Sequence, residues 1–195
     1  MASKNVLLEL QGKILEMLKE KLPSNLYYHN YEHTLDVLEA TERIAKAENA
    51  SYEEMQLLKT AAVFHDVGYI YSRENHEQKS CMIAREILSF NGIENDVVEK
   101  VCELILATKV PHNPKDKLSE IICDADLDYL GRDDYFPISH NLFKEFKNFG
   151  IVKDENDWKH LQVKFLESHH YFTKTAINTR KNKKEEHLRK IKESL

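Results

Sequence analysis

Hydrophobic residues recur every three or four positions along most of the chain, which is the spacing of one face of an α-helix. Asn5 to Leu22 is the first such run, and Pro23 ends it because proline cannot continue a helix interior. The same pattern predicts further helices from Tyr31, from the N-cap Ser51 to Gly68, from His76 to Asn91-Gly92, and over Asp96 to Lys109, Leu118 to Leu130, Phe136 to Phe149 and Asp154 to Ile177. We therefore expect an all-α protein.

Length and composition point to one domain. The 195 residues suit a single domain with a sizeable core, and the sequence contains no repeat, low-complexity segment or linker. Five glycines and four prolines are too few for a turn-rich β architecture. We expect residues 1–195 to form a single helical domain.

Charge and cysteine usage narrow the classes of partner and compartment. The formal net charge of −5 gives no general attraction for nucleic acid or an anionic membrane, so we expect neither as a partner. Residues 178–195 are locally basic, but glutamates interrupt the basic residues, which favours a solvated terminal helix. Cys81, Cys102 and Cys123 lie within helical patterns and indicate buried thiols of a reducing compartment. With neither a signal peptide nor a membrane-spanning run, we expect a cytoplasmic protein.

Three polar side chains fall on helix faces that are otherwise apolar. His33 shares a stripe with Val37, and His65 shares one with Leu58, since residues three or four apart lie on one face. Asp126 lies at the edge of the apolar face of its own helix. Burying a polar group is costly unless it is paired or bound to a metal. One metal ion bound by all three side chains would remove that cost.

Two further aspartates extend this group. Asp66 follows His65 directly, and an imidazole with a carboxylate suits Zn, Mn or Fe. At about 100° per residue, Asp124 points away from the side that Asp126 faces, so we expect a supporting or capping role for it, with a role as metal ligand as the less favoured alternative. We expect Asp128 to be solvated. Three or four nitrogen and oxygen ligands with open positions are typical of a catalytic metal site. Such a site produces hydroxide from bound water near neutral pH.

The chain beyond Gly131 contains no residues that we interpret as catalytic or metal-binding, apart from Arg132 as a candidate phosphate contact. Its apolar stripes are interpreted as core rather than as a cofactor-binding surface, and they comprise Phe143, Phe146, Phe149, Trp158, Leu161, Phe165 and Leu166. Five histidines have no other candidate ligand at helical spacing and are interpreted as having no role in the site. They are His140, His160, His169, His170 and His187.

The segments YHNYEH, FHDVGY and DADLDYLG, in the order H…HD…D, resemble the HD-domain superfamily of metal-dependent phosphohydrolases. The similarity covers roughly Tyr27 to Leu130. It implies an HD-like helical bundle with a motif-bearing core at 27–130, completed by C-terminal helices at 136–195. The implied metal ligands are His33, His65, Asp66 and Asp126, holding one or two divalent ions among Mn, Mg, Zn, Co and Fe.

Further resemblances concern the general acid and a second metal. YHNYEHTLDV is similar to a segment of cyclic nucleotide phosphodiesterases, which implies that His29 donates a proton to the leaving oxygen. NHEQKSCMIA resembles the helix start that gives binuclear HD enzymes an extra histidine, here His76. Where many binuclear members have another histidine, this chain has Thr108, with His112 one turn later. The HDxxHxG and HDxxED patterns are absent, and the number of metals stays open.

The resulting functional prediction is a phosphohydrolase that cleaves a phosphate ester of a nucleotide or a related small molecule. Metal-bound hydroxide would attack phosphorus while His29 protonates the leaving oxygen, with Asp66 serving the metal and the reaction together. Four basic residues near the motifs are candidates for phosphate contacts, namely Arg73, Lys79, Lys109 and Arg132. The sequence leaves the oligomeric state open.

Two alternative functions remain. A di-iron oxygenase on the same fold would need a second metal, and therefore His76 and His112. A ligand-binding or regulatory module would use the fold without turnover, since fold and ligands do not by themselves establish function.

Overall fold

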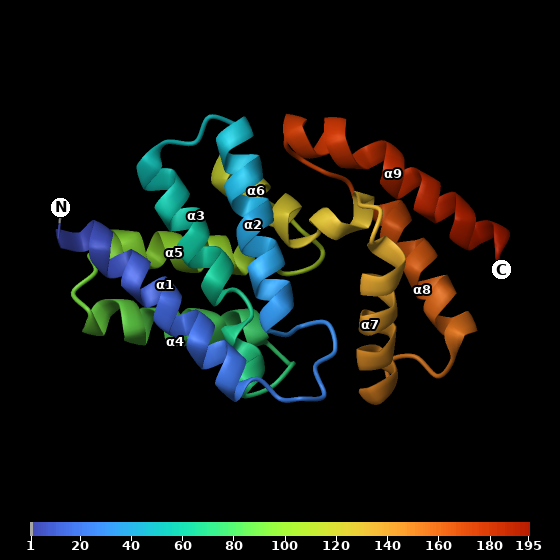
Figure 1. Ribbon diagram of the computed structural model, residues 1–195, viewed down its shortest axis with the longest axis horizontal. Coiled ribbons are helices and arrows are strands. Elements are labelled where there is room, and N and C mark those ends of the chain that lie inside the picture. The colour runs from blue at the N-terminus through green and yellow to red at the C-terminus, as the bar shows by residue number, and fades with distance from the viewer. Residues whose placement is uncertain (1) are drawn as a thin grey trace.

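The computed structural model describes residues 2–195, which contain nine α-helices, two short 3-10 helices and no strand (Figure 1). The elements are α1 (Ala2–Lys21), α2 (Tyr31–Ala47), α3 (Tyr52–Phe64), η1 (Val67–Ile70), α4 (His76–Phe90), α5 (Asn95–Ala107), α6 (Lys117–Asp126), η2 (Asp128–Gly131), α7 (Tyr135–Asn148), α8 (Glu155–Ser168) and α9 (Lys174–Glu193). The predicted all-α fold is confirmed.

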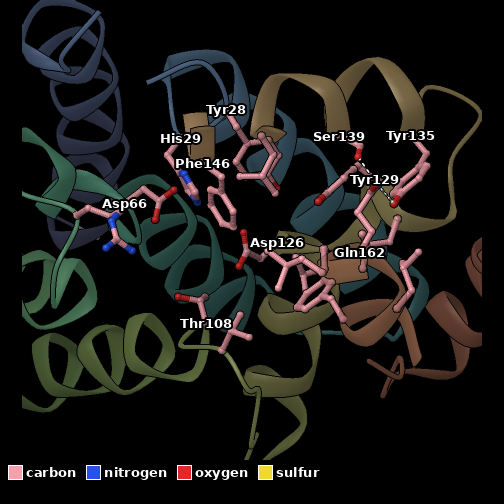
Figure 2. A pocket seen from close by; sticks show the side chains of 18 of the residues that line it. Tyr28, His29, Asp66, Thr108, Asp126, Tyr129, Tyr135, Ser139, Phe146 and Gln162 are labelled. Atoms are coloured by element: carbon pink, nitrogen blue, oxygen red, sulfur yellow. Dashed lines mark hydrogen bonds between the residues drawn. The ribbon is translucent and has the colours of Figure 1, made fainter. Parts of the chain in front are cut away.

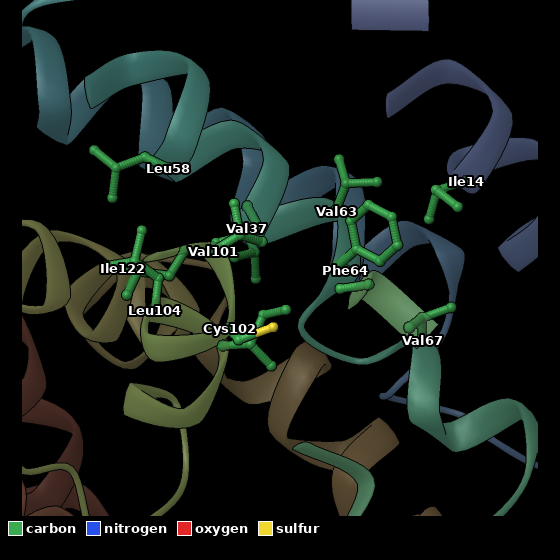
Figure 3. Close-up of a cluster of buried hydrophobic side chains, with 14 of the residues drawn as sticks. Ile14, Val37, Leu58, Val63, Phe64, Val67, Val101, Cys102, Leu104 and Ile122 are labelled. Carbon is green, nitrogen blue, oxygen red and sulfur yellow. The ribbon is translucent and has the colours of Figure 1, made fainter. Parts of the chain in front are cut away.

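The helices form two lobes with separate hydrophobic clusters. Helices α1–α6, here called the first lobe, enclose the larger cluster, and η2 with α7–α9, here called the second lobe, enclose the smaller one (Figure 1). In the larger cluster, side chains such as Val37, Phe64 and Ile122 meet from different helices (Figure 3). Burial of such side chains stabilises the fold by about 1.5–3 kcal/mol each.

Side-chain caps fix where the helices of the first lobe begin. Ser51 caps α3 and forms a reciprocal capping box with Glu54, as the sequence predicts. Asn30 caps α2 by accepting a hydrogen bond from the backbone N–H of His33 at 3.1 Å. This cap places His33 in the first turn of α2.

The expected helix at Asp154–Ile177 is wrong, because the chain leaves the helix between α8 and α9. Asp124 on α6 accepts hydrogen bonds from the backbone N–H groups of Phe172 and Thr173, and from the Thr173 hydroxyl. Thr173 in turn caps α9. The predicted helix Leu118–Leu130 is likewise divided into α6 and η2.

Gly68 does not end a helix as expected, since α3 ends earlier, at Phe64. It lies within η1, where a Cβ would come 2.1 Å from the carbonyl oxygen of His76. Its N–H donates to Ser80, whose hydroxyl donates to the carbonyl of His65. Glycine therefore allows η1 to pack directly on α4.

Asp128 is not solvated, contrary to expectation. Its side chain is only 2% exposed and forms ion pairs with Arg43 at 2.6 Å and Arg180 at 2.8 Å. The expectation that the C-terminal helix is solvated is also wrong in part, because Lys184 and His187 on α9 are buried. Asp128 thus connects α2 in the first lobe with α9 in the second.

The three cysteines are buried and free, as the helical patterns predict. Within residues 2–195, every helix is too short or too polar to cross a lipid bilayer.

Gly131→Ala should destabilise the protein by about 1–3 kcal/mol, because the added methyl overpacks a closed contact. A Cβ at Gly131 would lie 2.3 Å from the carbonyl oxygen of Arg180, so η2 and α9 would have to separate. Gly12→Ala on α1 is the control, since nothing lies within 4 Å of its Cβ position, and it should stabilise by about 0.5–1 kcal/mol. Urea denaturation of the two variants and of the wild type measures these changes in the free energy of unfolding. Equal stability of Gly131→Ala and wild type would contradict this packing.

Candidate metal centre and adjoining pocket

Three helices bring four predicted ligands to one point. His33 lies in the first turn of α2, and Asp126 is the last residue of α6. His65 and Asp66 follow the last residue of α3, where the chain turns into η1. The residues His33, His65 and Asp66 are 8%, 1% and 4% exposed, and the side chain of Asp126 is 12% exposed.

The donor atoms of these side chains surround a small volume. The Nε2 atoms of His33 and His65 lie 3.4 Å apart. Each of them lies 3.3–3.6 Å from Oδ2 of Asp66 and 3.2–3.6 Å from Oδ1 of Asp126. Two ligands held about 2.1 Å from one ion are about 3.0 Å apart at a right angle and about 3.4 Å apart at a tetrahedral angle. The observed separations therefore suit a shared cation.

The hydrogen bonding of the same groups also fits a divalent metal. Oδ2 of Asp66 is buried and accepts no hydrogen bond from the described residues, which is costly for a carboxylate oxygen. Nδ1 of His65 lies 2.7 Å from the carbonyl of Ala62, and donation to that carbonyl leaves Nε2 with a free lone pair. The group His33, His65 and Asp66 places one ligand atom of each within 4.8 Å of the others.

Without a cation, a proton on His65 supplies positive charge at this site. Burial lowers the pKa of His65, but the charges of Asp66 and Asp126 outweigh burial and raise it to about 9. Burial raises the pKa of Asp66 and of Asp126, whereas the neighbouring histidines lower both below the ordinary range. Two ionised carboxylates thus face His65, whose proton a metal would have to displace.

His76 approaches the opposite oxygen of Asp66. Its Nε2 lies 3.5 Å from Asp66 Oδ1 and 3.6 Å from a carboxylate oxygen of Glu77. Its Nδ1 lies 3.0 Å from the carbonyl of Arg73, so Nε2 again has the free lone pair. The structure brings His76 to the edge of the candidate centre, together with Glu77, which the sequence analysis did not identify.

His112 and Asp124 lie outside the ring of donors. Nε2 of His112 is 3.1 Å from the carbonyl of Thr108 and 3.9 Å from Asp126 Oδ2, so the proton on this nitrogen faces the carbonyl. Asp124 points away from the donors to the chain before α9, where Thr173 and not Asp124 caps the helix. Burial raises the pKa of Asp124 to about 6, against the hydrogen bonds from Thr173 and Phe172, which lower it.

His29 is held by a glutamate that the sequence analysis missed. Glu145 on α7 is fully buried, contacts Nδ1 of His29, and accepts from the backbone N–H groups of Tyr28 at 2.8 Å and His29 at 3.1 Å. The ring of Tyr69 stacks on His29 with centroids 4.4 Å apart. Glu145 is 116 positions from His29 in the chain, and it carries no local motif.

The same contact sets the charge of His29. Burial lowers the pKa of His29, but the hydrogen bond that its ring donates to Glu145 and the charges of Asp66, Glu145 and Asp126 outweigh burial, and the pKa is raised. Burial raises the pKa of Glu145, but the hydrogen bond and charge of His29, together with the backbone hydrogen bonds from Tyr28 and His29, lower it by more. The geometry therefore favours a protonated His29 beside an ionised Glu145.

A pocket of about 370 Å³ runs from the centre into the second lobe. Figure 2 shows Asp66, Asp126 and His29 at one end, with Tyr135 and Gln162 at the other. The apolar part of its wall is formed mainly by Leu142, Phe146, Trp158, Leu161, Phe165 and Leu166. Several residues interpreted as core thus line a pocket, because the sequence does not reveal how far α7 and α8 separate.

Of the four candidate phosphate contacts, only Arg73 lines this pocket. Its guanidinium lies 5.6 Å over the ring of Phe149 at the end of α7. Lys79 instead donates to Ser72 and to the carbonyl of Glu74. Arg132 is paired with Asp36 and Asp134, and the exposed Lys109 does not line the pocket either.

Comparisons with known proteins agree with this geometry. A family model described as HD domain matches residues 30–128. A search of curated proteins gives no match. Among solved structures, the crystal structure of Bacillus subtilis YpgQ in complex with ADP is similar, with a TM-score of 0.65 at 18% identity over 97% of this chain and 96% of that chain. At that identity the likeness concerns the fold.

Asp126→Asn should remove bound metal, whereas Asp124→Asn should keep it. Asp126 faces the histidines, so its neutral amide loses both charge and a ligand oxygen. Asp124 accepts hydrogen bonds from Thr173, so its amide should instead lower stability by about 1–3 kcal/mol. Elemental analysis and thermal unfolding of the two variants separate these effects. Loss of metal from Asp124→Asn alone would contradict the assignment.

The apparent affinity for Mn²⁺ should rise with pH up to about 9, the raised pKa of His65. Below that pH His65 holds a proton that the cation must displace, so affinity should fall by up to about tenfold per pH unit as pH decreases. Titration calorimetry at several pH values, in buffers of different ionisation enthalpy, measures both affinity and proton release. Binding that neither depends on pH nor releases a proton would contradict the role of His65.

Proposed function

The chain belongs to the HD domain family, and we propose that it is a metal-dependent phosphohydrolase that cleaves a phosphate ester of a nucleotide or a related small molecule in the cytoplasm. The observation that carries this proposal is the convergence of His33, His65, Asp66 and Asp126 at the inner end of a pocket. These four residues would hold the cation. When bound, a divalent ion lowers the pKa of water and polarises a phosphoryl oxygen.

The protein's own residues orient the substrate around that centre. Arg73 supplies a positive charge at the pocket wall, where a phosphate oxygen can accept from its guanidinium. Tyr28 and Tyr129 are buried, have rings 5.4 Å apart, and line the passage next to Asp126, which limits access of water. Asp66 contributes negative charge on both oxygens, Oδ2 towards His65 and Oδ1 towards His76.

His29 is the general acid of this proposal. Its Nδ1 contacts Glu145, which leaves Nε2 as the ring nitrogen available to the pocket. The proton on Nε2 moves to the leaving oxygen as the bond to phosphorus breaks, and Glu145 stabilises the charged ring before transfer. Stacking on Tyr69 keeps the ring in position.

Nucleotides are the substrates to examine first. The similar Bacillus subtilis YpgQ structure contains ADP. A pocket of about 370 Å³ lies at the lower end of the range that small-molecule sites occupy. The positions of His76 and Glu77 near Asp66 Oδ1 keep a second cation within the proposal, and a di-iron oxygenase remains the alternative if iron occupies both positions.

The direct test of the proposal is phosphate release from a panel of nucleotides and cyclic nucleotides, with Mn²⁺, Mg²⁺, Co²⁺, Zn²⁺ and Fe²⁺ added in turn to chelated protein. Release that depends on metal is expected. Absence of release with every substrate and metal, together with iron at two ions per chain and oxygen consumption, would favour the oxygenase.

His29→Ala should retain bound metal and lose on the order of 10²–10⁴-fold in rate on the best nucleotide, which is the usual contribution of positioned proton transfer. The loss should be much smaller on nitrophenyl phosphate, because nitrophenolate leaves without protonation. Glu145→Gln should show the same substrate dependence and shift the acidic group of the pH–rate profile to lower pH, since the charge that raises the pKa of His29 is removed. Equal losses on both substrates would make His29 a positioning residue.

A further inference from the structure

The end of the pocket farthest from the metal centre combines an apolar slot with a polar floor. The slot lies between α7 and α8, and the floor consists of Tyr135, Ser139 and Gln162 (Figure 2). We propose that this slot binds the base of a nucleotide, with Gln162, Tyr135 and Ser139 forming hydrogen bonds to the edge of the base. The inference rests on the proposed phosphohydrolase function for the position of the phosphate.

The walls of the slot suit a flat ring. Phe146 on α7 and Trp158 on α8 line the pocket and pack edge to face, with ring centroids 5.7 Å apart at 78°. They therefore form one continuous aromatic wall, and its Phe146 end lies towards His29 (Figure 2). Phe165 adds a third aromatic side chain, and all three are only partly buried, so apolar surface remains to be covered. Stacking of a base on an aromatic side chain is favourable whatever the base, because every base has a π-face.

The floor is buried and polar, which is unusual for an apolar slot. Tyr135, Ser139 and Gln162 are 2%, 3% and 8% exposed. The side-chain nitrogen of Gln162 donates to the hydroxyl of Tyr135 and to that of Ser139, each at 2.7 Å. These two bonds fix the orientation of the amide.

That arrangement leaves a defined set of hydrogen-bonding atoms for a ligand. Each hydroxyl accepts from Gln162, and because the hydroxyls of Tyr135 and Ser139 also bond to each other, one of their two protons remains to be donated to a ligand. Within residues 2–195, Oε1 of Gln162 accepts no hydrogen bond, and it can accept one from a ligand. A base presents acceptors and donors side by side on one edge and matches both roles.

Other ring-sized or chain-like groups match the slot less well. An aliphatic chain or an unsubstituted phenyl ring would cover this polar floor without accepting its remaining hydroxyl proton, and an unpaired buried donor is costly. A bare sugar would leave the surfaces of Phe146 and Trp158 uncovered. The combination of aromatic walls and a donor–acceptor floor therefore favours a nucleobase.

The continuity of the pocket sets the direction of the ligand. Asp66, Asp126 and His29 line one end of the same pocket whose other end is Gln162. A nucleotide bound in this direction places its phosphate at the metal centre and its base in the second lobe. The base site then lies outside residues 30–128, the segment that the family model matches.

Trp158 is the only tryptophan of the chain and lines the slot, so its fluorescence reports occupancy without any turnover. In the full chain with Mn²⁺, nucleosides and nucleoside monophosphates should quench this fluorescence saturably. Ribose 5-phosphate, which has no base, and phenyl phosphate, which has no polar edge, should bind at least tenfold more weakly at the slot.

Gln162→Leu should weaken nucleoside binding by on the order of tenfold or more, since a near-isosteric apolar group leaves the base edge unpaired. Its loss of kcat/KM should be larger on a nucleotide than on nitrophenyl phosphate, which has no base. Ser139→Ala and Tyr135→Phe provide milder variants if Gln162→Leu does not fold, and Lys164→Ala on the exposed side of α8 is the matched control.

The outcomes separate this inference from the proposed function. Quenching by nucleosides without phosphate release from any ester would retain the base site and overturn the phosphohydrolase. Phosphate release with equal quenching by phenyl phosphate and by nucleoside monophosphates, or with binding unaffected by Gln162→Leu, would overturn the base site alone. If no nucleoside quenches the fluorescence, the base site is likewise overturned.

Discussion

Two buried carboxylates, Asp66 and Asp126, face two imidazoles in the space between α2, α3 and α6. Desolvating ionised carboxylates costs several kcal/mol each unless a positive charge lies beside them. A proton on His65 can supply part of that charge, as the raised pKa of His65 indicates. A divalent cation supplies more of it, and the lone pairs already point inwards. The need to neutralise these carboxylates is the constraint that determines the chemistry of the centre.

Three further buried carboxylates connect the two lobes. Glu145 on α7 binds the segment before α2, including His29. Asp124 binds the chain before α9, and Asp128 pairs with Arg43 and Arg180. Since each carboxylate is satisfied only when the lobes are packed together, the pocket between them depends on the same contacts. His29, the proposed general acid, and the pocket wall are therefore positioned by the second lobe, although the proposed metal ligands come from the first.

The sequence predicted the helices and the inward histidines because both follow from one period. His33 and His65 fall on apolar stripes, and such positions can be recognised without knowledge of the tertiary structure. Asp126 was recognised in the same way. The break after Ser168 was not, because no proline or glycine marks it and the Asp124 hydrogen bonds that stabilise it come from another helix.

The other features that the sequence did not predict also depend on contacts between residues far apart in the chain. Asp128 was expected in solvent because a continuous helix would point it there, whereas the turn into η2 directs it towards Arg43. Glu145 resembles any charged residue of an amphipathic helix until α7 packs beside His29. To predict the slot between α7 and α8, one would need to know the spacing of the two helices, and an apolar stripe in the sequence does not give it.

The central claim is that His33, His65, Asp66 and Asp126 share one cation at the inner end of the pocket. Anomalous diffraction from crystals of the protein soaked in Mn²⁺ tests it most directly. The account predicts a peak within about 2.3 Å of Nε2 of both histidines and of an oxygen of each aspartate. A peak bound by other residues, or no peak while these four side chains keep their mutual distances, would contradict it.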